Sequence, residues 1–460
     1  MLKVLLANPP VVRSANSTPA NDFKIDHFVP NKWMAHSLLA RRAIDFLKVR
    51  FGLGKGVRYG VRAGSRWPWT IDSFLTEGGP PYPFFMGYTA GLLRAHGHDA
   101  QIRDAVAEAQ YNYEEFLADI KAYAPDIVIL ECTTPTLDID LWFAEKVSKF
   151  SEVALAGSHL TSKCDEVVRQ SPWASYFLKG EYILSALDMV TSRRKGIYES
   201  NVVKKIDDIP FPVRDYPSAS RYYDPTMPTA RPQLQIYGSK GCPFKCAFCL
   251  WPQTMYAGHV SLRSPQKIAE EIRQNVEEYG YKSIFFDDDT FNLGTERISE
   301  LCDELHTIGL PWSMMGRLDC SPNWLFDKMI DSGCVGMRFG VETFNKEVLA
   351  RVHKGIERTD FQQTLEHLAA SYHDIMIHVT MMRDLPGQTE EMHQQDMSIL
   401  KALHFSEFDM RRSYQLSRCV PFPGTRLYDE IREQLSGVDD DFRKYDGSQA
   451  TVLTNARESQ

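Results

Sequence analysis

Residues 237–252 read YGSKGCPFKCAFCLWP and place Cys242, Cys246 and Cys249 within eight positions. The cysteines come shortly after the apolar run QLQIYGS, residues 233–239, so a loop at the C-terminal end of a strand should carry them. A structural zinc site normally takes four Cys or His ligands, and His259 is the only local candidate for the fourth. Iron–sulfur clusters also take thiolates, and three of them on a four-iron cube leave one iron open to a substrate or cofactor.

Around this loop, short apolar runs alternate with amphipathic patterns. Between residues 233 and 435 the runs are QLQIYGS, SIFFDDD, PWSMMGR, VGMRFGVE, DIMIHVTMM and FDMRRSYQL. Six strand–helix units predict a partial (β/α)6 barrel, short of the closed eightfold barrel, with its functional rim at the C-terminal ends of the strands.

A second alternation occupies residues 1–195 and predicts a doubly wound, Rossmann-like α/β domain with a parallel sheet. Ligands of such sheets bind at the C-terminal ends of the strands. The residues expected there are Asn8, Thr133, Thr134, Gly157, Ser158, His159 and Gly180. No GxGxxG or GxxxxGK[ST] sequence stands at the strand-to-helix turns, which weakens a NAD or ATP interpretation.

Three segments lie outside these blocks. Residues 11–80 form an insertion with 11 Lys or Arg against 5 Asp or Glu and no clear periodicity. Residues 196–232 are rich in proline, which disfavours helix, and predict a surface linker. Residues 436–460 form a polar C-terminal tail.

Composition narrows the setting. The formal net charge of -8 argues against a dedicated nucleic-acid binder. No apolar run of about 18 residues occurs, and the N-terminus reaches Asn-Pro-Pro too early for a signal peptide, so we expect no membrane span and a cytoplasmic location. There, the nine cysteines should be free thiols or metal ligands.

The CxxxCxxC loop after the first barrel strand resembles the radical S-adenosylmethionine (SAM) superfamily. FFDDDTFN, GVET, LPGQTEE and PFPGTRLYDE follow in the order of that family's motifs. The resemblance implies that Cys242, Cys246 and Cys249 hold a 4Fe-4S cluster whose open iron binds SAM. It further implies that Phe248 packs near the adenine, that Asp287 or Asp288 receives the SAM amino group, and that Glu342 bonds the ribose hydroxyls.

The first block resembles the cobalamin-binding domain that precedes many radical SAM barrels, through LLANPP, LECTTPT, LAGSHLTS, LKGEYIL and IDDIPFPVRD. This resemblance assigns cobalamin to the strand-end residues named above together with Glu181. No Asp-x-His-x-x-Gly sequence is present, which implies a detached dimethylbenzimidazole tail and no histidine on the lower face of the corrin.

The basic insertion contains Arg62, Arg66, Trp67 and Trp69. One hypothesis is that this loop covers the lower face of the corrin or the substrate pocket and excludes water. Another is that the arginines bind an anionic substrate group or the cobalamin phosphate. A basic surface insertion without either role is the third.

The resemblance implies a cobalamin-dependent radical SAM methyltransferase that moves methyl from SAM through methylcobalamin to an unactivated carbon, or to phosphorus. The alternative keeps these cofactors but catalyses cyclisation, ring contraction or oxidation. A non-catalytic sensor is disfavoured by the complete SAM motif set, and a methylthiotransferase by the lack of a second cysteine triplet. The expected partners are a small-molecule or lipid substrate and an external one-electron reductant of the flavodoxin or ferredoxin type. Cys320 and Cys419 lie near strand ends and are candidates to face the substrate.

Overall fold

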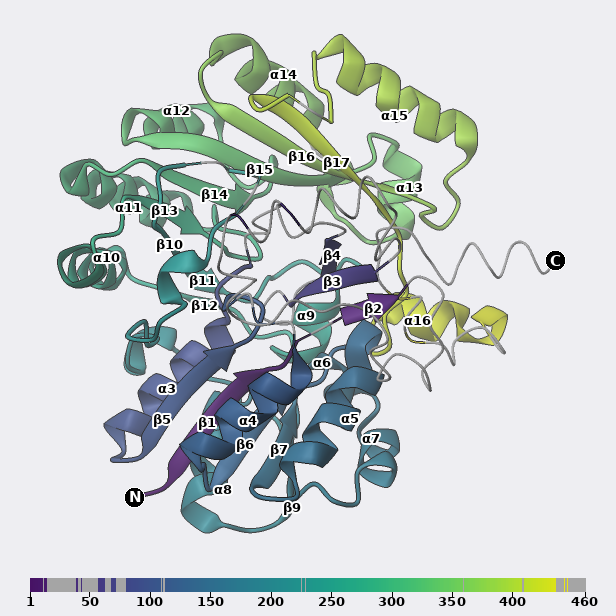
Figure 1. The fold of residues 1–460 in the computed structure, drawn as a ribbon. Helices are drawn as coiled ribbons and strands as arrows, with labels where there is room; N and C mark the ends of the chain where they lie inside the picture. The colour runs from purple at the N-terminus through teal and green to yellow at the C-terminus, as the bar shows by residue number, and fades with distance from the viewer. Residues whose placement is uncertain are drawn as a thin grey trace. The chain divides into compact units, whose positions relative to one another are not determined.

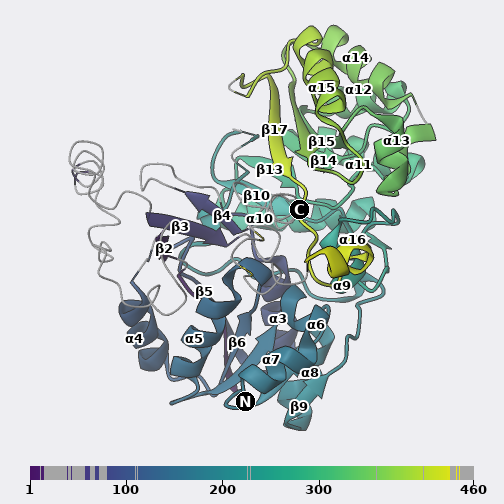
Figure 2. The same cartoon turned by 90° about the vertical axis from the view of Figure 1, so that its right-hand side faces the viewer.

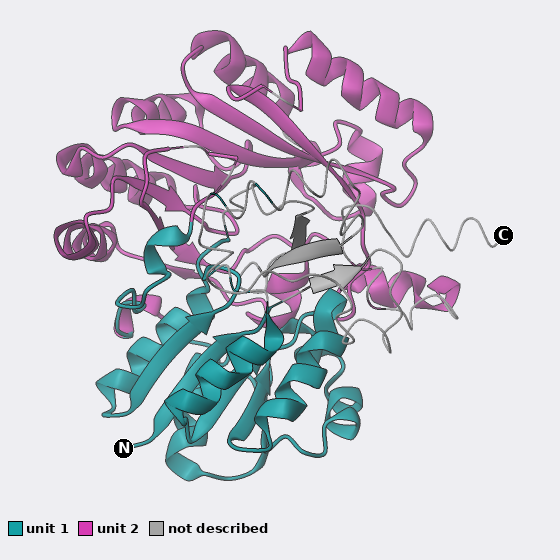
Figure 3. Cartoon of the chain, viewed as in Figure 1, with its two compact units in different colours: residues 1–203, 209–222 teal, residues 204–208, 223–460 magenta. Residues whose placement is uncertain are grey.

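The computed structural model describes residues 1–10 and 80–435, apart from 109, 111, 225, 228, 359 and 408. It also describes the backbone of three short strands between residues 12 and 71, and the isolated residues 39, 43, 442 and 445. The chain divides into two compact units, shown in Figure 3. Unit 1 comprises residues 1–203 and 209–222, and unit 2 comprises residues 204–208 and 223–460.

Unit 1 is built on a six-stranded parallel sheet (Figure 1). In spatial order its strands are β5 (Asp99–Asp104), β1 (Lys3–Asn8), β6 (Ile127–Glu131), β7 (Glu152–Ala156), β8 (Tyr176–Leu178) and β9 (Gly196–Tyr198). The central strands read KVLLAN and IVILE because a sheet covered on both faces needs apolar side chains on both. The predicted doubly wound domain is confirmed.

The helices of unit 1 lie on both faces of this sheet (Figure 2). They are α3 (Phe84–Ala95), α4 (Tyr113–Tyr123), α5 (Leu137–Val147), α6 (Ser158–Ser162), α7 (Cys164–Gln170) and α8 (Ile183–Ser192). Helices α3 and α8 pack on each other, and so do α4 and α5. Since β1 lies between β5 and β6, the next two strands that join this sheet along the chain, the direction of winding reverses beside it. A ligand of such a sheet binds outside the strand ends at this reversal.

Two features of unit 1 depart from the expected outline. Strand β9 extends the sheet into the range predicted as linker. The basic insertion contains an antiparallel sheet of β2 (Val12–Ser14), β3 (Val57–Arg62) and β4 (Pro68–Ile71), which the sequence does not predict because these strands are too short to show a period.

Unit 2 contains a second six-stranded parallel sheet, in the order of the chain. Its strands are β10 (Gln233–Ile236), β13 (Ser283–Phe286), β14 (Trp312–Gly316), β15 (Cys334–Glu342), β16 (Met376–Arg383) and β17 (Arg412–Arg418). The main helices between them are α10 (Pro265–Tyr279), α11 (Thr295–Ile308), α12 (Asn323–Asp331), α13 (Lys346–Arg351), α14 (Phe361–Ser371) and α15 (Glu390–Ala402). The predicted partial barrel is confirmed.

Alternation along the barrel strands separates a core from a polar inner face. On β15, Met337, Phe339 and Val341 belong to the core under the helices, so Arg338 and Glu342 point to the other face. Arg338 donates to Asp224 at 3.0 Å, and a Cβ on Gly336 would lie 2.6 Å from the sulfur of Met227. The segment just before the barrel therefore fills its N-terminal end.

Residues 209–222 of the Pro-rich segment are held against helix α3 by backbone contacts. Val213 N–H donates to the Gly87 carbonyl on α3 at 3.2 Å, and a Cβ on Gly91 would lie 2.6 Å from the Phe211 carbonyl oxygen. Glycines of α3 thus let residues 209–222 lie directly on that helix. Across the described residues, no helix is both long and apolar enough to cross a bilayer.

Candidate active site

The three cysteines lie on a loop closed by a short hairpin of β11 (Ser239–Lys240) and β12 (Ser261–Leu262). Gly241 begins the loop at φ +83°, and a side chain there would meet the His259 carbonyl. Cys249 caps helix α9 (Leu250–Thr254), and its N–H donates to the Cys246 carbonyl at 3.2 Å. Glycine therefore makes the tight exit from the barrel strand, and the short helix returns the chain to the hairpin.

The thiols are free and share one environment. Burial raises the pKa of the Cys249 thiol well above its ordinary value, and negative charge on Cys246 and Asp289 raises it further. Burial also raises the pKa of Cys242, whose sulfur lies 3.4 Å from the Thr290 hydroxyl oxygen. The thiolates formed by deprotonation would repel one another, so deprotonation needs a bound positive charge, which a metal centre supplies.

The donor set fits an iron–sulfur cluster better than a single ion. Within the described part of the chain, no three Cys, His, Asp or Glu side chains converge on one metal position. The imidazole Nε2 of His259 lies 2.9 Å from the Lys204 carbonyl oxygen, so this ring already has a backbone partner. Three soft thiols without a fourth ligand suit a cluster that spreads them over different irons.

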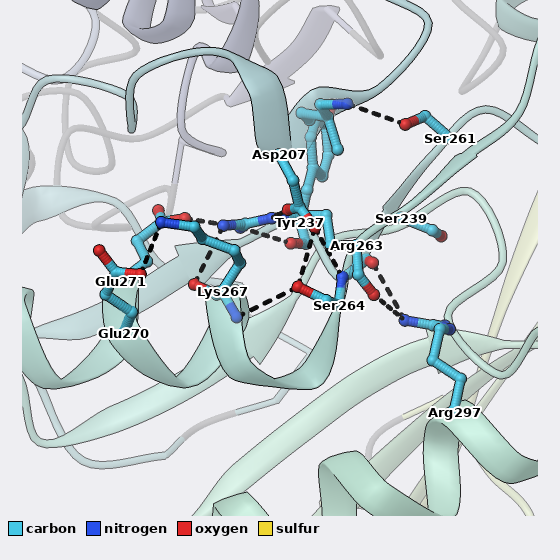
Figure 4. Close-up of polar contacts among 12 residues, drawn as sticks. Asp207, Tyr237, Ser239, Ser261, Arg263, Ser264, Lys267, Glu270, Glu271 and Arg297 are labelled. Carbon is cyan, nitrogen blue, oxygen red and sulfur yellow. Dashed lines mark hydrogen bonds and ion pairs between the residues drawn. The ribbon is translucent and has the colours of Figure 1, made fainter.

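A buried ionic network fixes the base of the hairpin (Figure 4). Arg263 donates to Glu271 at 2.6 Å, to Asp207 at 3.2 Å and to the Tyr237 carbonyl at 3.0 Å. Asp207 also accepts from the backbone N–H and hydroxyl of Ser264, at 2.8 and 2.9 Å. Because both the Arg263 and Glu271 side chains are at most 1% exposed, the network holds this end of the cysteine loop rigidly.

Three consecutive aspartates follow β13, and they divide by role. Asp288 is fully buried and accepts from Gly238 N–H at 2.9 Å, from Ser239 N–H, and from the Ser239 hydroxyl at 2.5 Å. Burial raises its pKa to about 6 despite these bonds. Asp288 therefore ties the strand end to the base of the cysteine loop, which leaves Asp287 as the better candidate for the SAM amino group.

Asp289 is a site residue that the sequence prediction missed. It is half-buried, and its charge contributes to the raised pKa of both Cys242 and Cys249. Strand β13 ends at Phe286 and the chain bends at Asp289, so strand alternation does not predict where this side chain lies. The available signal was only its place directly after Asp287 and Asp288 in FFDDDT.

Glu342 ends β15 at φ +69°, where the register with β16 shifts. It accepts from the Lys354 amine at 2.9 Å, and both side chains are buried. Burial lowers the pKa of Lys354, but Glu342 and Cys246 raise it more, so the amine stays charged. The half-buried ring of Phe248 packs against an apolar cluster that includes Val352 and Met382. A carboxylate and an apolar wall thus lie in the same unit as the cysteines.

In unit 1 the ends of β6 and β7 are joined through predicted site residues. His159 Nδ1 lies 3.1 Å from the Thr134 hydroxyl, and His159 N–H donates to the Cys132 carbonyl at 3.3 Å. A Cβ on Gly157, at φ +106°, would lie 2.7 Å from the Cys132 carbonyl oxygen. Glycine is therefore required here by the neighbouring strand.

Thr133, Thr134, Thr136, Asp140 and His159 form a buried polar cluster at these strand ends. Thr133 N–H and the Thr136 hydroxyl both donate to Asp140, at 3.1 and 2.8 Å. Burial lowers the pKa of His159 to about 3, so its ring is neutral. Neutral hydroxyl, amide and imidazole groups of this kind can bond the amide side chains of a corrin.

The remaining predicted residues lie at neighbouring strands. Gly180 N–H donates to Thr161 at 2.7 Å, and the buried Glu181 accepts from Val203 N–H at 3.4 Å. Asn8 ends β1 beside β6, and its side-chain oxygen Oδ1 is buried without a hydrogen-bond partner. An unsatisfied buried acceptor at the winding reversal fits a donor from a ligand.

The predicted loop residues are not all described. Arg62 ends β3, where only the backbone is placed, whereas Arg66, Trp67 and Trp69's side chain lie outside what the structure describes. Two further cysteines were candidates to face the substrate. Cys419 is fully buried, and Cys320 is half-buried near the charges of Asp319 and Cys242.

Fold and loop together define a class. Residues 236–399, within unit 2, match the Radical SAM superfamily. This class implies a 4Fe-4S cluster and SAM as cofactors. The sequence-based assignment to this superfamily is confirmed.

Two curated relatives match this chain over three quarters or more of its length. An uncharacterized methyltransferase from Pyrococcus horikoshii is 27% identical over 376 residues, covering 75% of this chain and 78% of that protein. An anaerobic magnesium-protoporphyrin IX monomethyl ester cyclase from Cereibacter sphaeroides is 23% identical and covers 79% of this chain and 62% of the cyclase.

A solved structure shares the fold of both units. The radical SAM methyltransferase TsrM from Kitasatospora setae, with cobalamin and a 4Fe-4S cluster bound, has a TM-score of 0.60 at 16% identity. The match covers 78% of this chain and 73% of TsrM.

Proposed function

We propose that this chain is a cobalamin-dependent radical SAM methyltransferase that acts on a small molecule or lipid. The observation that carries the proposal is the pairing of two sites in one chain. Unit 2 presents the buried Cys246 and the half-buried Cys242 and Cys249 on one loop, and unit 1 presents a polar cluster with a neutral imidazole at the ends of β6 and β7. When bound, the cluster supplies the electron that cleaves SAM, and cobalamin carries the methyl group.

The residues of unit 2 have distinct roles in this proposal. The three thiolates bind the cluster, and Asp287 accepts hydrogen bonds from the SAM amino group. Glu342, oriented by the Lys354 amine at 2.9 Å, accepts from the ribose hydroxyls. Phe248 gives the adenine an apolar surface. Asp288 contributes indirectly, because it holds the loop that carries the cysteines.

The residues of unit 1 bind cobalamin without placing a charged imidazole beside it. Thr133, Thr134, Ser158 and His159 offer hydroxyl, backbone and ring groups for the corrin amides, and Asn8 offers a buried acceptor. Gly157, Gly180 and Glu181 shape the adjoining strand ends. Arg62, Arg66 and Trp67 stay candidates for covering the corrin or binding an anionic substrate group.

Product analysis tests the proposal. The reconstituted chain, incubated anaerobically with a chemical one-electron reductant, cobalamin, labelled SAM and candidate substrates, should release 5'-deoxyadenosine and S-adenosylhomocysteine. The product should be heavier than its substrate by one methylene unit. Cys249→Ala should reduce these signals to background, whereas Cys164→Ala, at a half-buried cysteine of unit 1, should not.

The same assay separates the second candidate, which the similarity to a cyclase favours. Deoxyadenosine formed with substrate conversion but without S-adenosylhomocysteine or mass gain would replace methyl transfer by a cyclisation or oxidation. No cleavage of SAM under any condition would refute radical chemistry for this chain.

A further inference from the structure

A buried arginine contacts the cysteine loop between its first two cysteines. The guanidinium carbon of Arg317 lies 3.6 Å from the centroid of the Phe244 ring. Phe244 stands in the sequence CPFKC, so this contact joins the loop between Cys242 and Cys246 to the residue that follows β14. The Arg317 side chain is only 5% exposed. A cation on the face of an aromatic ring is attracted to it, and more strongly where water is absent.

The position of this guanidinium is fixed from several directions. Asp319 accepts from its Nε at 2.9 Å and from one terminal nitrogen at 2.8 Å, a two-point pair. The same terminal nitrogen donates to the Lys354 carbonyl at 3.0 Å. The Arg317 backbone is held by the buried Asn292, whose amide accepts from Arg317 N–H at 3.0 Å and donates to its carbonyl at 2.8 Å. A planar, bidentate-bonded guanidinium is preorganised and always charged.

The charge of Arg317 reaches the cysteines. Burial lowers the pKa of Arg317, but the pair with Asp319 and, to a smaller extent, negative charge on Cys246 raise it above its ordinary value. Interaction between charges strengthens as water is excluded, and both groups are buried. A reduced cluster carries one more negative charge than an oxidised one, so a nearby fixed cation stabilises the reduced state.

We propose that Arg317 is a positioning residue that clamps the cysteine loop through Phe244 and raises the reduction potential of the cluster held there. The inference rests on the proposed function in one respect, the assignment of the three cysteines to an iron–sulfur cluster. It concerns neither SAM contacts nor the identity of the substrate.

Redox titration of the cluster, followed by electron paramagnetic resonance in the absence of SAM, tests this proposal. Arg317→Gln should hold iron at the level of the unaltered chain but be harder to reduce. We expect at least about a tenfold lower ratio of reduced to oxidised cluster at a fixed reductant potential, equivalent to a shift of about 59 mV for one electron. Arg317→Lys keeps the charge but loses the planar contact with the Phe244 ring, so the reduction potential of its cluster should stay close to that of the unaltered chain.

Two controls separate charge from packing. The double variant Arg317→Gln/Asp319→Asn removes the ion pair as a whole, so its potential should return toward that of the unaltered chain. Arg273→Gln, at an exposed arginine of α10 that pairs with Glu304 at 2.7 Å, should leave the potential unchanged. An unchanged potential in Arg317→Gln at full iron content would overturn the inference.

The remaining outcomes are also decisive. If Arg317→Gln fails to hold iron, the lysine variant decides, because a lowered potential at full iron content there contradicts a role for the charge. If the unaltered chain shows no cluster signal at all, the proposed function itself fails, and this inference fails with it.

Discussion

Each unit has a fully buried aspartate, Asp104 or Asp288, whose pKa is raised by burial. In unit 1, Asp104 ends β5 and is fully buried. Its carboxylate accepts from the Tyr222 hydroxyl at 3.0 Å and from the N–H groups of Val106 and Ala107, at 3.1 and 3.3 Å. Burial nevertheless outweighs these bonds and raises the pKa of Asp104 to about 6. Asp104 therefore keeps its proton to a higher pH than an exposed aspartate does.

This shift predicts a pH dependence of stability. The folded-state pKa of Asp104 lies above the unfolded value of 3.8, so between about pH 4 and 6 the folded chain keeps a proton that the unfolded chain has released. The stabilisation from this group is therefore lost as pH rises through that window. Relative to Asp104→Asn, the unaltered chain should lose up to about 3 kcal/mol of unfolding free energy between pH 4 and 7.

Urea unfolding of the apo-chain at several pH values checks this expectation. Asp288, with a pKa also near 6, contributes to both proteins and cancels in the difference. Asp188→Asn, at an exposed carboxylate of α8, serves as the matched control and should follow the unaltered chain. A constant difference between Asp104→Asn and the unaltered chain across pH would contradict the assignment.

At the scale of elements, the β11–β12 hairpin determines where the cysteines lie. Its base is fastened by Asp288 on one side and by Arg263, Asp207 and Glu271 on the other (Figure 4). Residues 204–208 add a further tie, since Ile206 N–H donates to the Ser261 hydroxyl at 2.9 Å. A segment of the Pro-rich stretch is thus a structural part of the cysteine loop's support.

Asp207→Asn should loosen this support. The variant keeps the shape of the side chain but removes the charge that faces Arg263, which retains Glu271 as its partner. We expect the free energy of unfolding to fall by about 1.5–3 kcal/mol, the range for hydrogen bonds to charged groups. Hydrogen–deuterium exchange should speed up in peptides covering residues 237–264.

The neighbouring carboxylate provides the comparison. Asp208 is exposed, so Asp208→Asn should change stability by no more than about 0.5 kcal/mol and leave exchange in the hairpin unaltered. Equal exchange in all three proteins would show that Asp207 does not support the loop.

At the scale of the whole molecule, each unit repeats one arrangement with a different ligand set. Both sheets are parallel and six-stranded, and both gather polar side chains at strand ends. Both units carry carboxyl groups there, but unit 1 adds hydroxyl, amide and imidazole groups, whereas unit 2 adds thiols. The candidate ligands of cobalamin and of the cluster thus belong to separate compact units.

Because the two sets of candidate ligands lie in separate units, we expect iron and cobalamin to bind independently. In the variant Cys242→Ala/Cys246→Ala/Cys249→Ala the iron content should fall to background. Affinity for hydroxocobalamin, followed by absorbance, should change by less than about twofold, as expected for independent sites. Cys164→Ala, in unit 1, should keep both iron and cobalamin. A large loss of cobalamin affinity in the folded triple variant would show that unit 1 alone does not form the binding site.

The sequence by itself determined both folds and the position of the cysteine loop after the first barrel strand. Runs such as IVILE and SIFFDDD reveal buried parallel strands because local periodicity records burial directly. The spacing of Cys242, Cys246 and Cys249 is likewise local. Only the tertiary structure distinguished Asp288 from its neighbours and brought Arg317, Asp289 and Lys354 toward the cysteines. Those roles arise from side chains far apart in sequence, whose charges interact because folding buries them together, and no local pattern encodes that distance.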